Sequence, residues 1–178
     1  VTNNATNVVK FLTHHGFVNT DNEITEKGKI ASQIQEAHPL ALAHLILESN
    51  YFEHFTPQQI ACLLSCFTNI TVNDDVKIFH SRSLGNPVSQ YTDILDHKMK
   101  EYYESEYKFI QQDIGTDYTF HRDLQQHIFM WCDTNNETAC KEIIQTMQVE
   151  QNIALGDFVK AILKINCELN FQKNKNSY

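Results

Sequence analysis

The segment from Thr56 to Phe67 restricts the fold most, because it joins a clear helix start to an almost continuous apolar run. Its first four residues, Thr-Pro-Gln-Gln, match a capping box, in which Thr56 and Gln59 each satisfy a backbone N–H group of the other. Proline at the first helical position suits the same start. The residues that follow, IACLLSCF, leave little polar surface. The segment therefore predicts a helix buried on nearly every side, which needs several packing partners.

Other segments of the chain can supply those partners, because their apolar residues recur at the three-to-four-residue spacing of amphipathic helices. Helices are predicted over residues 5–15, from Thr25 to Ile34, from Pro39 to Leu47, from Val88 to about Gln112, through Leu124 and Trp131, through Ala139 and Met147, and from Gly156-Asp157 onward. Two very short strands or an extended turn, around an Asp-Asn pair, are predicted before Thr25. Asn, Asp and Gly-Asn-Pro between Asn69 and Pro87 indicate a loop. The predicted fold is all-α, a helical bundle with a small winged-helix-like hairpin near the N-terminus.

The 178 residues suffice for one substantial core. We expect a winged-helix-like connecting segment over residues 1–36, a helical bundle over 37–170 and a polar tail over 171–178. The opening at Val1 within a polar stretch predicts that the chain is a piece of a longer protein.

Charge and hydropathy restrict the function classes. With 14 Lys and Arg against 22 Asp and Glu, the net charge is −8, which argues against a surface that coats nucleic acid. Any nucleic-acid contact must be narrow. No apolar run approaches the roughly 20 residues that cross a bilayer, and the N-terminal residues lack the features of a signal peptide. We therefore expect no membrane contact and an intracellular location, in the nucleus or cytoplasm.

The sequence contains no recognisable catalytic motif. It has no G-x-x-x-x-G-K-[ST] phosphate loop and no G-x-S-x-G turn, so the chain by itself should not hydrolyse ATP. The five cysteines show no C-x-x-C spacing and predict buried free thiols. Cys62 and Cys66 lie one turn apart, but two ligands do not make a zinc site. The histidines show no metal-binding spacing either, so no metal and no cofactor are predicted for this chain.

The last predicted helix carries the main candidate site. In GDFVKAILKINCELN, an apolar stripe should pack on the bundle, while Lys160 and Lys164 lie one turn apart on another face. Such lysines are common on any surface helix. Two ammonium groups at this spacing could also follow successive phosphates of a single strand without selecting bases.

Trp131 is the second candidate, and it also allows two interpretations. A single tryptophan on an amphipathic helix is usually a core residue, but its ring could serve as a stacking platform for a base.

Two blocks of the sequence resemble a known family. The run ITEKGKIASQIQEAHPLALAHLILESNYFEHFTPQQIACLLSCF is similar to the start of the DSHCT domain, the C-terminal helical bundle of Ski/Mtr-type superfamily-two RNA helicases. The matches are Thr25, Lys27, Gly28, Ala31, Pro57, Gln59, Ala61, Leu63, Leu64, Ser65, Cys66 and Phe67. In the second block, the family has a Trp-bearing helix, a short helix and E-G-D-x-x-R-x-x-R-R-[LI]. Trp131, Gly156, Asp157, Lys160 and Lys164 fall on the corresponding positions.

The resemblance implies an accessory domain that packs against the motor domains of the same polypeptide and lines the exit of their RNA channel. It implies single-stranded RNA and proteins of RNA-processing complexes as partners, with ATP and Mg²⁺ bound by the motor domains. Lys160 and Lys164 would then replace arginines that face RNA, losing the planar fork that grips phosphate at two points. Leu155 replaces the usual glutamate, Ala139 an expected aromatic residue, and the family's final helices are not recognisable after Asn170.

The leading hypothesis is therefore an RNA-guiding accessory domain of an ATP-dependent RNA helicase. The alternative is an acidic module that docks a partner or braces the motor domains without touching RNA. Abundant Asn, Ile, Lys and Tyr hint at an AT-rich genome, such as that of a large DNA virus, in which case we expect the host cytoplasm.

Overall fold

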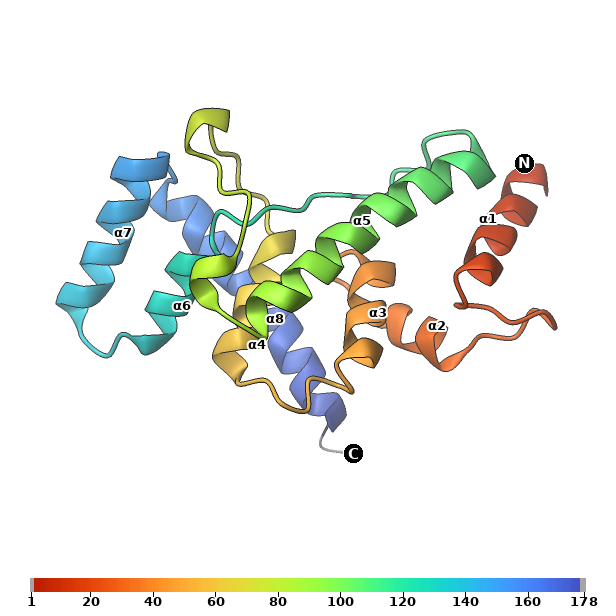
Figure 1. Cartoon of the computed structure of the whole chain (residues 1–178), viewed down its shortest axis with the longest axis horizontal. Helices are drawn as coiled ribbons and strands as arrows, with labels where there is room; N and C mark the ends of the chain where they lie inside the picture. Colours follow the sequence, from red (N-terminus) through yellow and green to blue (C-terminus); the bar gives the residue numbers. More distant parts are fainter. Residues whose placement is uncertain (1, 177–178) are drawn as a thin grey trace. The chain divides into compact units, whose positions relative to one another are not determined.

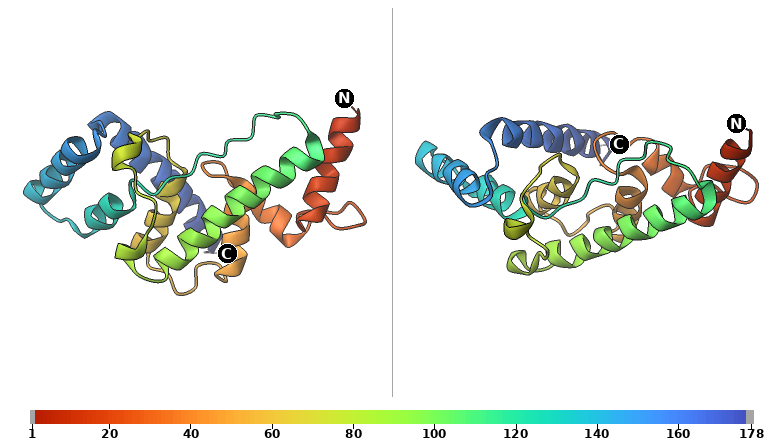
Figure 2. Two further views of the ribbon diagram at one scale, coloured as in Figure 1. Left: turned by 45° about the horizontal axis from the view of Figure 1, so that its top comes forward. Right: turned by 90° about the horizontal axis from the view of Figure 1, so that it is seen from above.

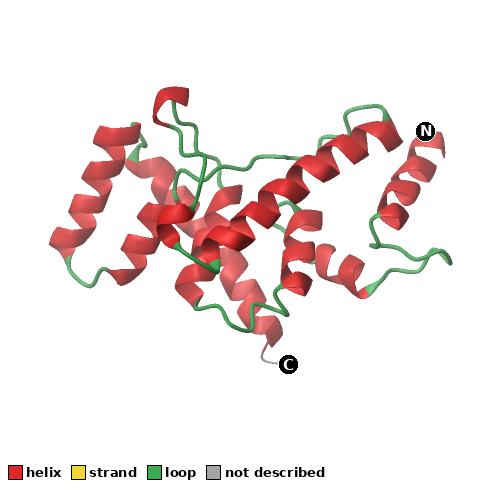
Figure 3. Ribbon diagram, in the orientation of Figure 1, coloured by secondary structure: helices red, strands yellow, loops and turns green. Residues whose placement is uncertain are grey.

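The computed structural model describes residues 2–176 and the side chains of residues 4–169. Within these residues the chain forms eight α-helices and three short 3-10 helices, with no strand (Figures 1 and 3). The all-α prediction is confirmed. The helices fall into two compact units, Val1–Glu53 with Ile94–Tyr118 and His54–Asp93 with Thr119–Tyr178. The predicted division at residues 36 and 37 stays a prediction.

The first unit contains α1 (Thr2–His14), α2 (Glu26–Ala31), α3 (Pro39–Glu48) and most of α5 (Val88–Ile110). Of the two predicted alternatives the extended turn is confirmed, because Val18 and Ile24 form a single isolated antiparallel bridge and not a pair of strands. Thr25 caps α2 as predicted, accepting a hydrogen bond from the Gly28 N–H. The helix ends at Ala31 and not at Ile34. The hairpin is therefore a tight turn that is followed directly by a short helix.

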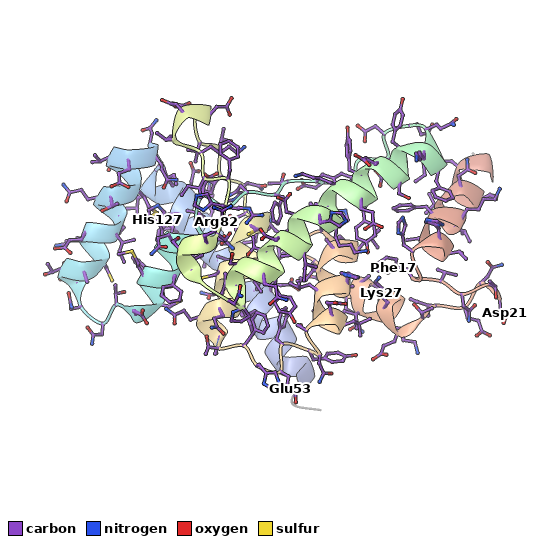
Figure 4. The ribbon with its side chains drawn as sticks, in the orientation of Figure 1. Phe17, Asp21, Lys27, Glu53, Arg82 and His127 are labelled. Carbon is purple, nitrogen blue, oxygen red and sulfur yellow. The ribbon has the colours of Figure 1, made fainter. Side chains whose placement is uncertain are left out.

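The Lys-Gly pair within α2 has a steric and an electrostatic role in this turn. A Cβ at Gly28 would collide with the carbonyl oxygen of Phe17 and lie 2.7 Å from Cγ1 of Ile24. Only glycine therefore allows the turn to approach α2 so closely. The Lys27 Nζ lies 4.9 Å from the centre of the Phe17 ring, within cation–π range, and both residues are labelled in Figure 4.

Helix α3 forms the buried centre of the first unit and packs against α2. Its start matches the prediction, with Pro39 in the first turn, and the His38 Nδ1 accepts a hydrogen bond from the Ala41 N–H at 3.2 Å. Burial of the His38 ring lowers its pKa from 6.5 to about 4. The cap is therefore made by a neutral imidazole at physiological pH.

The second unit is built around α4 (Pro57–Leu64), which continues into the 3-10 turn η1 (Ser65–Phe67). The predicted capping box is present in full at its start. Helix α4 packs against α6 (Gln125–Asp133) and α8 (Leu155–Asn176), and α7 (Glu137–Gln151) packs against α6. The two views of Figure 2 agree that α8 runs beside α4. The apolar run of α4 is buried because it is covered from more than one side.

The segment between α4 and α5 is a loop as predicted, interrupted only by the 3-10 turns η2 (Asp74–Val76) and η3 (Arg82–Leu84). Helix α5 begins at Val88 as predicted and ends at Ile110, two residues before the predicted end. Its first residues, 88–93, belong to the second unit. The whole loop therefore belongs to the second unit.

Candidate nucleic-acid interface

The apolar stripe predicted for the last helix anchors α8 in the second unit. Phe158, Ala161 and Ile165 are buried, and the helix packs against α4 and η1. These residues follow one another at steps of three and four, as one face of a helix requires. The stripe fixes the rotation of α8 and so decides which way each lysine points.

Lys164 lies at the edge of this packed face. Its Nζ donates a hydrogen bond of 2.9 Å to the carbonyl oxygen of Phe67, at the end of η1. The last carbonyl groups of a helical segment have no partner inside the helix, and a lysine ammonium suits them. The side chain is half-buried. Lys164 therefore has a structural contact that spacing alone did not indicate.

Lys160 lies one turn earlier and has a different environment. Its side chain is exposed, and within residues 4–169 it has neither an ion-pair nor a hydrogen-bond partner. The two lysines share a side of α8, but only Lys160 extends into solvent. An exposed ammonium on a fixed helix can meet a phosphate without first breaking a contact in the protein.

Trp131 lies on α6 and packs on α8. Its ring meets Phe158 edge to face, with the centroids 5.2 Å apart and the planes at 81°. The indole is half-buried and lines a cleft of about 360 Å³ between α4, α6 and α8, together with Pro57, Ile162 and Asn166. One edge of Trp131 therefore belongs to the core, while another borders a cleft.

The second unit contains a buried polar network that no sequence motif indicated. The Gln125 side chain donates 2.8 Å to the Thr92 Oγ1 and 3.3 Å to the carbonyl oxygen of Cys62, and it accepts a hydrogen bond from Ser81. Arg122 donates 2.9 Å to the Ser81 Oγ and pairs with Asp93 at 2.9 Å. Satisfied buried polar groups fix the position of the segments that carry them. This network ties the loop, α5 and α6 to α4.

His121 extends the network toward α8. Its Nε2 lies 2.7 Å from the carbonyl oxygen of Thr68, and its Nδ1 accepts a hydrogen bond from the Asp123 N–H at 3.2 Å. Burial lowers the pKa of the ring, and the positive charges of Lys77 and Lys164 lower it further. The imidazole is therefore neutral at physiological pH, and its partner Thr68 directly follows Phe67, which accepts from Lys164.

The DSHCT (NUC185) family model matches residues 21–169, which is more than half of the chain. The chain belongs to the DSHCT family. DSHCT is the non-catalytic C-terminal accessory domain of Ski2-like helicases, so the family resemblance seen in the sequence is confirmed. No curated protein matches the chain.

The DSHCT match extends from the turn before α2 to the apolar face of α8. It therefore includes the Lys-Gly pair of α2, the capping box of α4, Trp131 and both α8 lysines. The structure gives physical reasons for several of these positions. Gly28 permits a close approach, the Thr56 box starts α4, and Trp131 packs on Phe158.

The cysteines of this DSHCT domain are free thiols, but the prediction that all are buried is wrong. Cys62 and Cys66 are buried, Cys140 is half-exposed, and Cys132 and Cys167 are exposed. Burial raises the pKa of Cys62 to about 12. Within the described residues, no group of three or more His, Cys, Asp or Glu side chains could hold a metal ion. None of the helices in the same range has the length and apolar character needed to span a bilayer.

Proposed function

We propose that this DSHCT domain belongs to an ATP-dependent RNA helicase, lines the exit of its RNA channel, and guides single-stranded RNA along α8. The observation that carries the proposal is the exposed Lys160 ammonium, held one turn before Lys164 on a helix whose other face is buried. A fixed cation positions a phosphate without reading the base, as a translocating helicase needs.

Lys164 can support the same contact although it donates a hydrogen bond to η1. A lysine ammonium has three donors, and the bond to the Phe67 carbonyl oxygen uses one of them. The other donors of a half-buried ammonium remain able to meet a phosphate oxygen. In this proposal Lys164 sets the distance between the RNA strand and η1, and Lys160 contributes an exposed cation. Trp131 supports α8 through Phe158 and offers a ring edge at the cleft.

We propose that ATP and Mg²⁺ are bound outside this domain. The sequence has no phosphate-binding loop, and the described residues offer no cluster of metal ligands. We therefore assign both groups to the motor domains of the same polypeptide. In this proposal the DSHCT domain holds the single-stranded RNA while the motor domains translocate it.

The proposal is tested by fluorescence anisotropy of labelled single-stranded RNA with the 178-residue chain over a salt series. Lys160→Glu should weaken binding and lower the salt slope by about 0.7, as expected when one phosphate fewer is neutralised on a single strand. Lys141→Glu is the control for the charge change, because Lys141 is an exposed lysine on α7 of the same unit, where it pairs with Glu137 at 2.8 Å. Equal affinities for Lys160→Glu and Lys141→Glu would refute the α8 path.

A second function, bracing of the motor domains, is favoured by a different observation on the same helix. Leu155, Val159 and Leu163 recur every four residues and are each at least 45% exposed. Such a row is an apolar strip on α8, and strips of this kind often mark contact surfaces. Val159→Asp should weaken association with separately produced motor domains and leave the RNA affinity of the chain unchanged. If it changes RNA affinity alone, the bracing function is wrong.

A further inference from the structure

The loop before α5 carries two exposed cations, a histidine and an aromatic side chain within six residues, after the exposed pair Asp74-Asp75. Lys77, His80 and Arg82 are all exposed. The ring of Phe79 lies among them and is 72% exposed, one of the highest values for a large apolar side chain of the described residues. Exposure of the whole phenyl ring leaves its face open for a ligand to stack on.

The loop is held on both sides of Phe79. The Ile78 N–H donates a 2.8 Å hydrogen bond to the buried carboxylate of Asp123. The Ser81 hydroxyl donates to Gln125 and accepts from Arg122, as described above. Figure 4 shows Arg82 in the region of the second unit that also contains His127 of α6. Phe79 is therefore presented between two fixed points and loses little freedom when a ligand binds.

A cleft of about 360 Å³ adjoins the ring. Its lining includes Lys77, Phe79, His80, Ser83, Arg122 and Gln126. This surface combines the Phe79 ring with the Lys77 ammonium, an imidazole, and amide and hydroxyl groups. Its other cation, Arg122, is buried and already pairs with Asp93. That mixture suits a nucleobase with its phosphates, whereas an acidic peptide with apolar anchors would need a more apolar cleft.

The loop also lies close to the proposed RNA path. The Lys164 ammonium donates to the carbonyl oxygen of Phe67, and His121 lies 2.7 Å from the carbonyl oxygen of the next residue, Thr68. The Ile78 N–H of the loop donates to Asp123, two residues after His121. The cations of the loop and the cation of α8 therefore border one region of the second unit. A single strand that follows α8 would pass near the loop.

We propose that residues 77–84 form a second contact for single-stranded RNA, in which a base stacks on Phe79 while Lys77, His80 and Arg82 meet the flanking phosphates. This inference rests on the function proposed above. It adds a stacking residue to a path that otherwise consists of phosphate contacts. It also predicts tolerance of any base, because every base has a π-face.

The test measures binding of a fluorescein-labelled oligouridine to the 178-residue chain at low salt. Phe79→Ala should weaken binding about 5-fold or more, as expected when one base–aromatic stack is removed. Phe79→Tyr is the matched control, since it keeps the ring face, and it should bind like the unchanged chain. Because Phe79 is exposed, neither variant should alter the thermal melt.

A comparison with Lys160→Glu separates this inference from the proposed function. If Lys160→Glu weakens binding and Phe79→Ala does not, the α8 path stands and the loop contact is refuted. If the unchanged chain binds no oligouridine, both are refuted for this chain. A polyglutamate peptide that binds as tightly, and equally needs Phe79, would overturn the assignment to RNA in favour of an acidic protein partner.

A second measurement reports on stacking directly. Trp131 is the only tryptophan of the chain, so Phe79→Trp in a Trp131→Phe background places a single fluorophore at the loop. Stacking of a base on this ring should quench its fluorescence as oligouridine saturates the chain. Binding without quenching would place the RNA elsewhere and overturn the inference.

Discussion

Replacement of Lys164 by methionine separates the structural role of this lysine from its role toward RNA. Methionine keeps an unbranched apolar side chain but removes the ammonium that donates to the Phe67 carbonyl oxygen at 2.9 Å. A hydrogen bond from a charged donor contributes about 1.5–3 kcal/mol to stability. Lys164 is half-buried, so water can reach the carbonyl oxygen and replace part of this bond. We expect stability to fall by roughly 1–2 kcal/mol, from that range reduced for exposure.

The assay is urea unfolding followed by the fluorescence of Trp131, which lies in the same unit as Lys164. In a thermal melt of a chain of this size, the same loss of stability corresponds to a melting temperature lower by about 2–8 °C. Lys160→Met is the control and should stay within about 0.5 kcal/mol of the unchanged chain, because Lys160 is exposed. Lys164→Arg should recover most of the stability, since a guanidinium still donates. Equal stabilities of Lys164→Met and Lys160→Met would refute the anchoring role.

Three further predictions concern other parts of the chain. Gly28→Ala should destabilise the fold by about 3 kcal/mol, because its Cβ would collide with neighbouring backbone, whereas Gly156→Ala meets open space and should not; thermal melts with equal midpoints would contradict this. The pKa of His38 is lowered to about 4 in the folded chain, so the unfolded chain binds more protons between pH 6.5 and 4. The free energy of unfolding should therefore decrease by up to ~3 kcal/mol as the pH is lowered through that window. His38→Asn keeps a capping group and should flatten that fall in circular dichroism; an unchanged pH profile counts against it. Cys167 should react with a thiol reagent in the folded chain and Cys62 only on unfolding, because Cys62 is buried and its pKa is raised to about 12; equal labelling rates would exclude this.

Helix starts were predictable because they depend on residues that are close in sequence. The Thr56 capping box and the Thr25 cap both form as predicted, since the groups that bond are three residues apart. Ends were less predictable. Helix α2 stops at Ala31 because its C-terminal carbonyl groups are satisfied within the following turn, and no local signal marks that residue.

The environment of the candidate residues could not be predicted from spacing. Lys160 and Lys164 are equivalent in the sequence pattern, yet one is exposed and the other donates to a carbonyl group of a residue 97 positions earlier. Trp131 likewise packs on Phe158 of another helix. Such pairings depend on how helices far apart in sequence pack against each other, which periodicity along one helix does not specify.

The amino-acid sequence was enough to establish the all-α class, the family and the absence of a catalytic motif, because these follow from local periodicity, capping residues and short motifs. Which polar groups are buried together depends instead on the packing of distant segments. The network of Ser81, Thr92, Arg122 and Gln125 joins a loop and three helices, and it fixes Phe79 at the surface. The bonded pairs of this network lie 33 to 44 residues apart, so their hydrogen bonds exist only after the apolar faces have packed.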